Sequence, residues 1–366
     1  MKKQSTGFAA KSVVSSSKCP IERASYASQM CVILTEKCNI RCRHCINNCS
    51  PSGGENLDMG ILESFIRQAA ESIFVSSIGF SGGEPFIDIE RMEQAVGLCR
   101  EYGLDCTVST NGFWASSVAA AKNILGRLKG LSRLCVSTDV FHQEFIPSTM
   151  IINAINACNE LDIDCCILVT YLNDPGQEVE TVRQNLRDAK GSYEIQQWPV
   201  LRIGRALSEI DHDAFFIIDL SNAVCVSADS PTLNVSGELI ACCGPASQWP
   251  QGHRLSLKYT SKQSLKETLQ AADQDPVIHA LRVWGPTQLL RLAISSARQK
   301  GFSFAAPEVV DMCSICERLC TDPFRTDLVQ QALDAYQTQR ELAVARMIQL
   351  GEVSMFHHLT HGKETA

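Results

Sequence analysis

The sequence lacks any apolar run close to the 18 or so residues that a helix needs to cross a bilayer. Its first 30 residues are mostly polar with short apolar breaks, and they do not form the apolar segment and small-residue cleavage site of a secretory signal. Basic residues are not in excess, since 33 Lys and Arg stand against 40 Asp and Glu. A nucleic-acid groove lined by Lys and Arg is therefore not expected, although a local basic patch stays compatible with this balance. We expect a cytoplasmic protein with no membrane and no nucleic-acid partner.

Glycine and proline are also few, with 22 and 13 residues in a chain of 366, whereas hydrophobic residues make up 45%. This composition excludes collagen-like, disordered and low-complexity chains. At roughly 150 residues per domain, the length favours two domains or one large α/β unit with an appendage.

What the chain has in excess is cysteine, with 18 residues. In a reducing compartment clustered thiols bind metal more often than they form disulfides. Eleven of the 18 fall into local groups: Cys38, Cys42, Cys45 and Cys49; Cys165 and Cys166; Cys242 and Cys243; Cys313, Cys316 and Cys320. The others, including Cys31, are isolated in sequence. Free cysteine commonly behaves as a small buried hydrophobe, and on that ground six residues are assigned to the core: Cys99, Cys106, Cys135, Cys158, Cys165 and Cys166.

From Met30 to about Ile203, short apolar runs alternate with longer helical patterns, which is typical of repeated βα units and a parallel sheet. The expected strands are 31–35, 76–81, 105–110, 133–138, 163–170 and 194–200. The expected helices lie near 57–73, 88–103, 116–129, 148–161 and 176–189. Six strands with five helices predict an α/β fold in the form of a partial (β/α)6 TIM barrel, because a closed barrel needs eight units.

The pattern changes after Gly204-Arg205-Ala206. Residues 219–253 predict short strands and turns, with a hairpin turn at Ser236-Gly237. Two helices are expected within 261–300, separated near Gly285-Pro286, and a last helix is expected from about Asp327 to Leu350, ended by Gly351. The predicted domains are a flexible N-terminal extension (1–27), the barrel core (28–210), a small β-hairpin plus helix auxiliary domain (211–325), and a C-terminal helix and tail (326–366).

In such a barrel the chemistry belongs at the C-terminal ends of the strands. Polar and reactive residues follow the first four expected strands. They are Lys37 and Cys38, then Gly82-Gly83-Glu84-Pro85, then Asn111 and Gly112, then Asp139 and His142.

Cys38, Cys42 and Cys45 follow the first strand within eight residues. Three thiolates can hold one cubane cluster and leave its fourth iron open to an exogenous ligand. A zinc site is the alternative, but structural zinc takes four ligands. The x3-x2 spacing resembles the radical S-adenosylmethionine (SAM) superfamily, in which the open iron of a [4Fe-4S] cluster binds the amino and carboxylate groups of SAM.

A second motif supports this resemblance. Gly82, Gly83, Glu84 and Pro85 resemble the GGEP segment of that superfamily, which meets the methionine amino group of SAM at the end of the second strand. Glycines let backbone approach a ligand closely, and a carboxylate pairs with an ammonium group. The resemblance implies a radical SAM core over about residues 30–210, with SAM and a [4Fe-4S] cluster as cofactors.

The resemblance implies further cofactor contacts. His44 stands where the family has an aromatic residue against the adenine. Ser109, Asn111, Ser137 and Asp139 resemble positions that hold ribose and carboxylate, with turn and cap chemistry as the alternative. Arg205 resembles part of a segment common before the auxiliary domain of peptide-modifying members, with a plain surface arginine as the alternative.

The second thiol set consists of Cys225, Cys242, Cys313 and Cys316, with Cys243 and Cys320 as spares. Its opening resembles the SPASM or Twitch auxiliary domain, in which a hairpin presents two cluster ligands. The pattern is too short for two further clusters, so it implies one auxiliary [4Fe-4S] cluster saturated by four thiolates. Whether Cys320 replaces Cys225 stays open.

The segments SGGEPFID, STNGFWA, STDVFHQEF, GELIACCGPAS and MCSIC together resemble radical SAM peptide epimerases of the epipeptide type. In these enzymes an adenosyl radical takes a Cα hydrogen from a ribosomally made precursor peptide, and a thiol returns hydrogen on the opposite face to give a D-residue. Cys243 matches that donor thiol, with a buried or alternative ligand thiol as the other interpretation. The resemblance also implies an electron donor such as flavodoxin or ferredoxin.

Two rival functions stay open. The first is another radical SAM peptide maturase, which forms a thioether or carbon–carbon crosslink or an oxidised residue. The second is a non-catalytic iron–sulfur protein, against which the intact cysteine triad and Glu84 argue.

Overall fold

The computed structural model describes residues 26–172, 174–211, 214–215, 224–259, 264–302 and 311–351. Cys19, nearly all of the predicted N-terminal extension and the tail from residue 352 lie outside the described residues. No helix among the described residues is long and apolar enough to cross a membrane.

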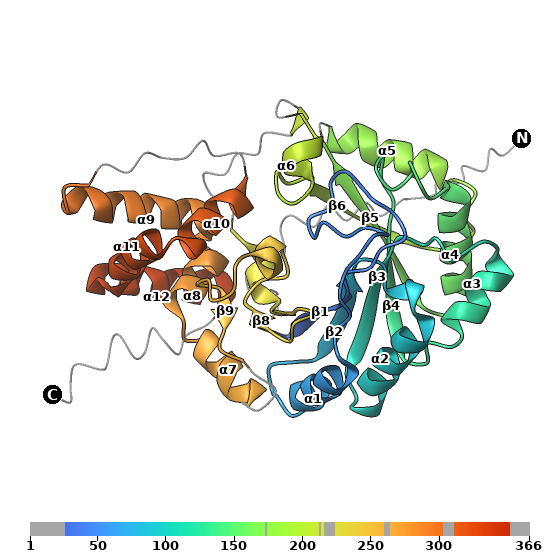
Figure 1. The fold of residues 1–366 in the computed structure, drawn as a ribbon, viewed down its shortest axis with the longest axis horizontal. Helices are drawn as coiled ribbons and strands as arrows, with labels where there is room; N and C mark the ends of the chain where they lie inside the picture. Colours follow the sequence, from blue (N-terminus) through green and yellow to red (C-terminus); the bar gives the residue numbers. More distant parts are fainter. Residues whose placement is uncertain are drawn as a thin grey trace, which may run out of the picture.

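The first half of the chain forms an open parallel barrel (Figure 1). Its strands pair in sequential order: β1 (Gln29–Thr35), β2 (Ser77–Gly82), β3 (Asp105–Thr110), β4 (Leu131–Ser137), β5 (Asp164–Tyr171) and β6 (Glu194–Pro199). The helices between them are α1 (Met59–Ala70), α2 (Ile89–Glu101), α3 (Val118–Leu125), α4 (Ser148–Glu160) and α5 (Pro175–Asn185). The predicted six strands and five helices of a partial barrel are confirmed.

The barrel core lies between the outer face of the sheet and its helices. Along β1, the side chains of Met30, Val32 and Leu34 are fully buried. The opposite face of the sheet points into the barrel, and Cys31 on β1 and Ser137 on β4 are only half-buried there. Side chains that alternate along a strand therefore give the sheet a packed outer face and an inner face on which Cys31 and Ser137 keep solvent-accessible surface.

A short hairpin extends the same sheet. It consists of β7 (Thr232–Leu233) and β8 (Leu239–Ile240), and β9 (Ser256–Leu257) pairs with β8. Asn234 Oδ1 accepts from the amides of Ser236 and Glu238, and Gly237 has φ +81°, so the predicted turn is confirmed. Because β7 pairs in parallel with β1, the hairpin continues the barrel sheet and does not form a sheet of its own.

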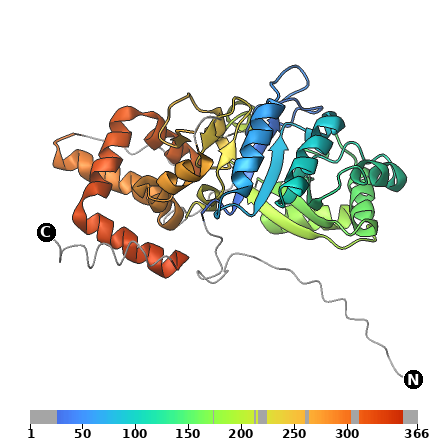
Figure 2. The same ribbon diagram turned by 90° about the horizontal axis from the view of Figure 1, so that it is seen from below.

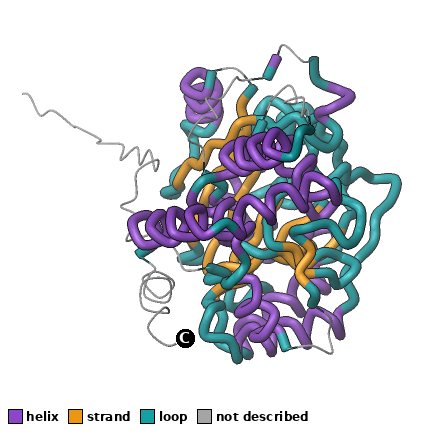
Figure 3. The backbone as a smooth tube through the Cα atoms, turned by 90° about the vertical axis from the view of Figure 1, so that its left-hand side faces the viewer, coloured by secondary structure: helices purple, strands orange, loops and turns teal. Residues whose placement is uncertain are grey.

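The remaining described helices are α6 (Ala206–Glu209), α7 (Leu265–Ala272), α8 (Pro276–Val283), α9 (Gly285–Gln299), α10 (Met312–Thr321), α11 (Pro323–Asp334) and α12 (Tyr336–Leu350). Of these, α7 to α12 lie beside the barrel, not around it (Figures 1 and 2), whereas Figure 3 views the molecule from their side. The described residues also form three short 3-10 helices: η2 (Pro85–Ile87), η4 (Val226–Asp229) and η5 (Pro245–Gln248).

Two predictions about these helices are wrong. Residues 264–302 hold three helices instead of two, because Asp275 caps a new helix that begins with Pro276. The expected last helix is two helices, since Ala335 has an extended backbone that ends α11 before α12 begins. Gly351 ends α12 in the left-handed conformation, as predicted.

Candidate active site

The loop after β1 carries the three thiols expected to hold a cluster. Cys38 and Cys42 are buried and Cys45 is partly exposed. Burial raises the pKa of Cys38 to about 12, and the nearby Glu84, Cys42 and Cys45 add to this rise. The three thiols therefore lie in one neighbourhood at the C-terminal end of β1.

Cys49 brings a fourth thiol to the same loop, although no role was predicted for it. A hydrogen bond between the two side chains lowers the pKa of Cys45 to about 6 and raises the pKa of Cys49. The Cys49 thiol also contacts the carbonyl of Asn47 at 3.7 Å. The only sequence signal for this arrangement is the short distance from Cys45.

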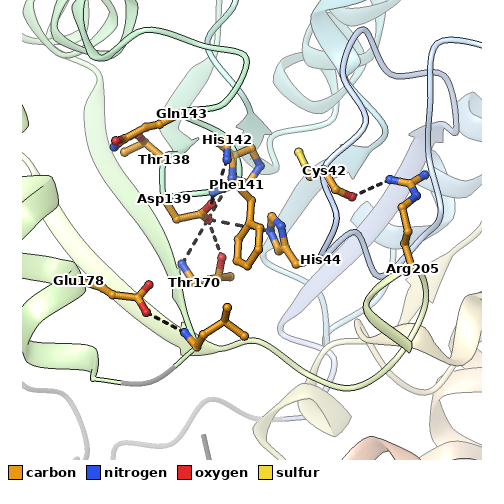
Figure 4. Close-up of polar contacts among 11 residues, drawn as sticks. Cys42, His44, Thr138, Asp139, Phe141, His142, Gln143, Thr170, Glu178 and Arg205 are labelled. Atoms are coloured by element: carbon orange, nitrogen blue, oxygen red, sulfur yellow. Dashed lines mark hydrogen bonds and ion pairs between the residues drawn. The ribbon is translucent and has the colours of Figure 1, made fainter. Parts of the chain in front are cut away.

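Arg205, which follows the last barrel strand, holds the cysteine loop by hydrogen bonds. Its guanidinium donates to the carbonyl oxygens of Cys42 and Cys49, both at 2.7 Å, and its backbone amide donates to Cys45 O at 3.0 Å. Only 6% of Arg205 is exposed, so it is not a surface arginine. Gly204 beside it has φ +57°, and a Cβ there would lie 2.5 Å from Cys45 O. The Gly-Arg pair thus shapes the loop that carries the thiols, and Figure 4 shows the contact of Arg205 with Cys42.

The two glycines after β2 lock the same loop from the other side. The amide of Gly83 donates to Thr35 O at 2.7 Å, and that of Glu84 donates to Lys37 O at 2.8 Å. A Cβ on Gly82 or Gly83 would stand 2.1 Å from one of these carbonyl oxygens. The glycines were expected to let backbone approach a ligand closely, but the backbone that lies against them here belongs to the cysteine loop itself.

Glu84 joins the ends of β2 and β3. Its Oε1 accepts from Phe86 N at 3.0 Å and Thr110 Oγ1 at 2.8 Å, and its Oε2 accepts from Asn111 N at 2.7 Å. Complete burial raises the pKa of Glu84 to about 7, although these hydrogen bonds oppose the rise. Oε2 can accept a further donor, because a carboxylate oxygen accepts two hydrogen bonds. Pro85, also buried, begins η2 directly after it.

The other polar residues predicted at these strand ends have different surroundings. The Asn111 amide donates to Asn39 Oδ1 at 2.8 Å and its Oδ1 accepts from Phe113 N, so it ties the end of β3 to the cysteine loop. Ser109 and Ser137 are half-buried on the inner face of the barrel, and the described residues offer their hydroxyls no side-chain partner.

Asp139, which follows β4, lies beside two histidines, His142 and His44 (Figure 4). Its Oδ1 accepts from the amides of Phe141 and His142, and its Oδ2 accepts from Thr170 Oγ1 at 2.5 Å and contacts His142 Nδ1 at 2.9 Å. His44 Nε2 lies 3.9 Å from the same oxygen, and its ring packs on Phe141 with centroids 4.5 Å apart. The cap chemistry considered as an alternative for Asp139 is therefore present.

The charges of this group are strongly coupled. Burial alone would lower the pKa of His142, but the Asp139 carboxylate raises it, and a hydrogen bond with the Cys42 side chain adds to the rise. Burial alone would raise the pKa of Asp139, but the charge and hydrogen bond of His142 lower it. Burial lowers the pKa of His44 to about 4, against the attraction of Asp139. His142, expected with Asp139 among the functional candidates after the fourth strand, thus connects Asp139 to the first thiol set.

Two observations concern the fit of a bound group. His44 Nδ1 and Asn47 Oδ1 are buried without a hydrogen-bond partner in the described part of the chain. An unpaired buried polar atom is costly, so such atoms mark places where a ligand or water supplies the missing partner. Ligand atoms of His44, Asp139 and His142 also lie within 4.8 Å of one another, a geometry that could hold a metal ion. The donor set beside the thiols therefore fits a polar cofactor.

The second thiol set forms a separate neighbourhood between the hairpin and α10. Burial raises the pKa of Cys242, with further rises from Cys225, Cys243 and Cys313. The hydrogen bond between the thiols of Cys316 and Cys320 raises the pKa of Cys316, and their sulfur atoms lie 3.9 Å apart. Asp311 caps α10 through the amide of Ser314 at 2.8 Å. Both Cys225 and Cys320 belong to this neighbourhood, so the choice between them stays open.

Cys243 differs from the thiols of this set. It is exposed, and its amide donates to Ser227 O at 3.3 Å. A hydrogen bond from the thiol of Cys31 lowers the pKa of Cys243 to about 7 and raises that of Cys31. No role was predicted for Cys31 from the sequence, because an isolated cysteine within a strand has the same local pattern as a core residue.

Comparisons with known proteins follow the same division of the chain. Residues 32–189 match the radical SAM superfamily. Over 301 residues the chain is 22% identical to the Bacillus subtilis (strain 168) peptide biosynthesis protein YydG, covering 80% of this chain and 92% of that protein. Over 123 residues it is 31% identical to GTP 3',8-cyclase of Mycolicibacterium smegmatis, covering 31% of each chain.

A solved structure shares the fold. Streptococcus suis SuiB bound to S-adenosylmethionine superposes with a TM-score of 0.50 at 15% identity, covering 71% of this chain and 69% of SuiB.

Proposed function

We propose that this radical SAM enzyme, whose radical SAM domain spans residues 32–189, modifies a ribosomally made peptide and inverts an L-residue to a D-residue. The similarity to a peptide biosynthesis protein along most of both chains supports a peptide as substrate. Cys243 is the residue that favours epimerisation over crosslinking or oxidation. It is an exposed cysteine beside five others, which already suffice to hold a cluster.

SAM and its [4Fe-4S] cluster, when bound, supply the radical that removes a hydrogen atom from a substrate carbon. The residues proposed to hold the cluster are Cys38, Cys42 and Cys45. Their loop is fixed on one side by Arg205 and on the other by the amides of Gly83 and Glu84. Such bracing keeps the thiols in one geometry before any cofactor binds.

The proposed SAM contacts come from three strand ends. Glu84 offers Oε2 to an ammonium group, and burial makes that pairing strong because little solvent screens it. His44, packed on Phe141 with a free Nδ1, is suited to lie against a purine ring. Ser109 and Ser137 present free hydroxyls to the inside of the barrel.

Asn111 and Asp139 act on SAM indirectly in this proposal. Their side chains are engaged with the cysteine loop, with the turn after β4 and with His142, so they position the groups that contact the cofactor.

A second, auxiliary [4Fe-4S] cluster of the SPASM or Twitch kind is part of the proposal. Its ligands are Cys242, Cys313 and Cys316, with either Cys225 or Cys320 as the fourth. The mutual rise of their pKa values supports this set, because thiols that raise one another's pKa stand close together and favour a shared cation. Flavodoxin or ferredoxin is the proposed electron donor, and the cytoplasm the proposed location.

The proposed role of Cys243 rests on the stereochemistry of the substrate radical. A planar Cα radical has lost its configuration, so a thiol that donates from the opposite face inverts the centre. Cys243 lies beyond β8, next to the strand that begins the barrel, and the residue keeps exposed surface although its thiol packs against Cys31.

The test uses a precursor peptide from a small open reading frame beside the gene. After anaerobic reaction, acid hydrolysis and chiral chromatography should detect a D-residue in a peptide of unchanged mass. Cys243→Ala should still cleave SAM but give no D-residue, whereas the matched variant Cys135→Ala should behave as the wild type, since Cys135 lies on β4 outside both thiol sets. A wild-type product that is lighter by two hydrogens would support crosslinking or oxidation instead.

A further inference from the structure

Cys31 and Cys243 meet from distant parts of the chain. Cys31 lies in β1 and pairs with Thr232 of β7, while Cys243 follows β8, which pairs with β7. Each of the two thiols shifts the pKa of the other, so the side chains of Cys31 and Cys243 are neighbours where the sheet pairing brings their backbones together. The continuation of the barrel sheet into the hairpin is what brings these two residues together.

Both backbones are anchored to one segment. The amide of Cys31 donates to Pro231 O at 2.8 Å, and the amide of Cys243 donates to Ser227 O at 3.3 Å. The two carbonyls are four residues apart, and the segment between them contains most of η4, so both cysteine backbones are held by one short piece of chain. Both residues also keep accessible surface, Cys243 more than Cys31.

We propose that Cys31 is a second catalytic thiol, which forms a disulfide with Cys243 after Cys243 has given its hydrogen atom to the substrate. The inference rests on the proposed epimerase function, and it adds the residue that deals with the sulfur radical left behind. Without a partner, that radical would stay beside the newly formed Cα–H bond and could remove its hydrogen again.

The step balances in atoms and electrons. The Cys243 S–H bond breaks as the Cα–H bond of the product forms, which leaves one unpaired electron on the Cys243 sulfur. The Cys31 thiol loses its proton to water, and an S–S bond forms with release of one electron to an oxidised one-electron carrier of the flavodoxin class. A dithiol of the thioredoxin class then restores both thiols by exchange and is itself oxidised to a disulfide.

No other described thiol fits this task as well. Cys242 is adjacent in sequence, but its sulfur accepts from Gly244 N at 3.1 Å and it is buried among the other thiols of the second set. Cys31 lies outside both proposed ligand sets, so its oxidation would leave every proposed cluster ligand in place.

The first experiment tests the pair without substrate. The holoenzyme is incubated anaerobically with glutathione disulfide, quenched in acid, alkylated and digested, and its disulfides are mapped by mass spectrometry. We expect a Cys31–Cys243 disulfide that dithiothreitol reverses. Protection of neither thiol from alkylation would overturn the proposal, and this result does not depend on whether the enzyme is an epimerase.

The second experiment follows turnover with precursor peptide and a flavodoxin-class donor, with dithiol omitted or added. Wild type should accumulate the Cys31–Cys243 disulfide in step with inverted peptide, and added dithiol should restore multiple turnovers. Cys31→Ser should complete a first inversion and then slow by about tenfold or more, because a hydroxyl cannot form the S–S bond. Cys135→Ser is the matched control, since Cys135 also faces another thiol, Cys166, and should behave as wild type.

The outcomes are distinguishable. Steady turnover by Cys31→Ser at the wild-type rate, with inversion intact, would overturn the role of Cys31 and leave the epimerase standing. Absence of inversion in wild type, with SAM cleaved, would overturn the proposed function and with it the catalytic role of Cys31. The glutathione experiment would then still report whether the two thiols form a redox pair.

Discussion

Arg205 offers a sharp test of how the cysteine loop is held. Its guanidinium is buried and donates to two carbonyl oxygens of the loop. Hydrogen bonds to a charged group contribute about 1.5–3 kcal/mol each, so the loss of two in Arg205→Ala should weaken the folded loop by about 3–6 kcal/mol. A typical domain has a total stability of about 5–15 kcal/mol, so the chain should still fold while the loop opens.

The assay is iron content after anaerobic reconstitution and gel filtration. Arg205→Ala should lose about half of its iron, the part bound by Cys38, Cys42 and Cys45, and should stop cleaving SAM. Arg205→Lys should recover only part of the iron, because an ammonium group cannot hold both carbonyls in the fork geometry of a guanidinium. The matched control is Arg41→Ala. Arg41 lies on the same loop and pairs with Glu209 of α6, but it is exposed, and its removal should leave the iron content unchanged. Full iron and full SAM cleavage in Arg205→Ala would refute the bracing role.

Three further predictions concern the cofactors and the helical region. Glu84→Gln should weaken SAM binding by about tenfold or more without loss of iron, because a buried ammonium would lose its charged partner; equilibrium dialysis with unchanged affinity would remove Glu84 from the site. The wild-type chain should bind about eight irons, and the triple variant with Ala at Cys38, Cys42 and Cys45 should bind about four and cleave no SAM; full iron in that variant would show that the two ligand sets are wrongly divided. Burial, with the charge of Arg346, lowers the pKa of His279 to about 3, so the folded state resists protonation that the unfolded chain accepts below about pH 6.5. Thermal stability should therefore fall between pH 7 and pH 5, and a His279→Leu variant that keeps the same fall would contradict this assignment.

The sequence predicted the barrel well because its strands are short apolar runs between strong helical patterns. Each strand can be recognised from its own residues. In β1, for example, every second residue is apolar and faces the core, namely Met30, Val32 and Leu34. The three thiols after β1 and the polar residues after β2 to β4 were also foreseen, since parallel strands end at one edge of the sheet.

Other features depend on contacts that no local pattern encodes. Arg205 reaches the cysteine loop across more than 150 residues, and only the folded barrel shows that its guanidinium holds the carbonyls of that loop. Cys31 has the same local signature as a core cysteine, and its partner is revealed only by the pairing of β7 with β1. The break at Ala335 lacks the glycine or proline that usually marks the end of a helix, which is why one long helix was expected there.

The central claim is that Cys243 returns hydrogen to a peptide Cα, and deuterium incorporation tests it most directly. A thiol exchanges its hydrogen with solvent, whereas the hydrogen removed by the adenosyl radical comes from carbon. In D2O, wild type should yield a D-residue that carries deuterium at Cα, about one mass unit heavier per inverted residue, together with 5'-deoxyadenosine free of deuterium. Cys243→Ala should give SAM cleavage without deuterated product. A wild-type product lighter by two hydrogens, formed equally well by Cys243→Ala, would contradict the account.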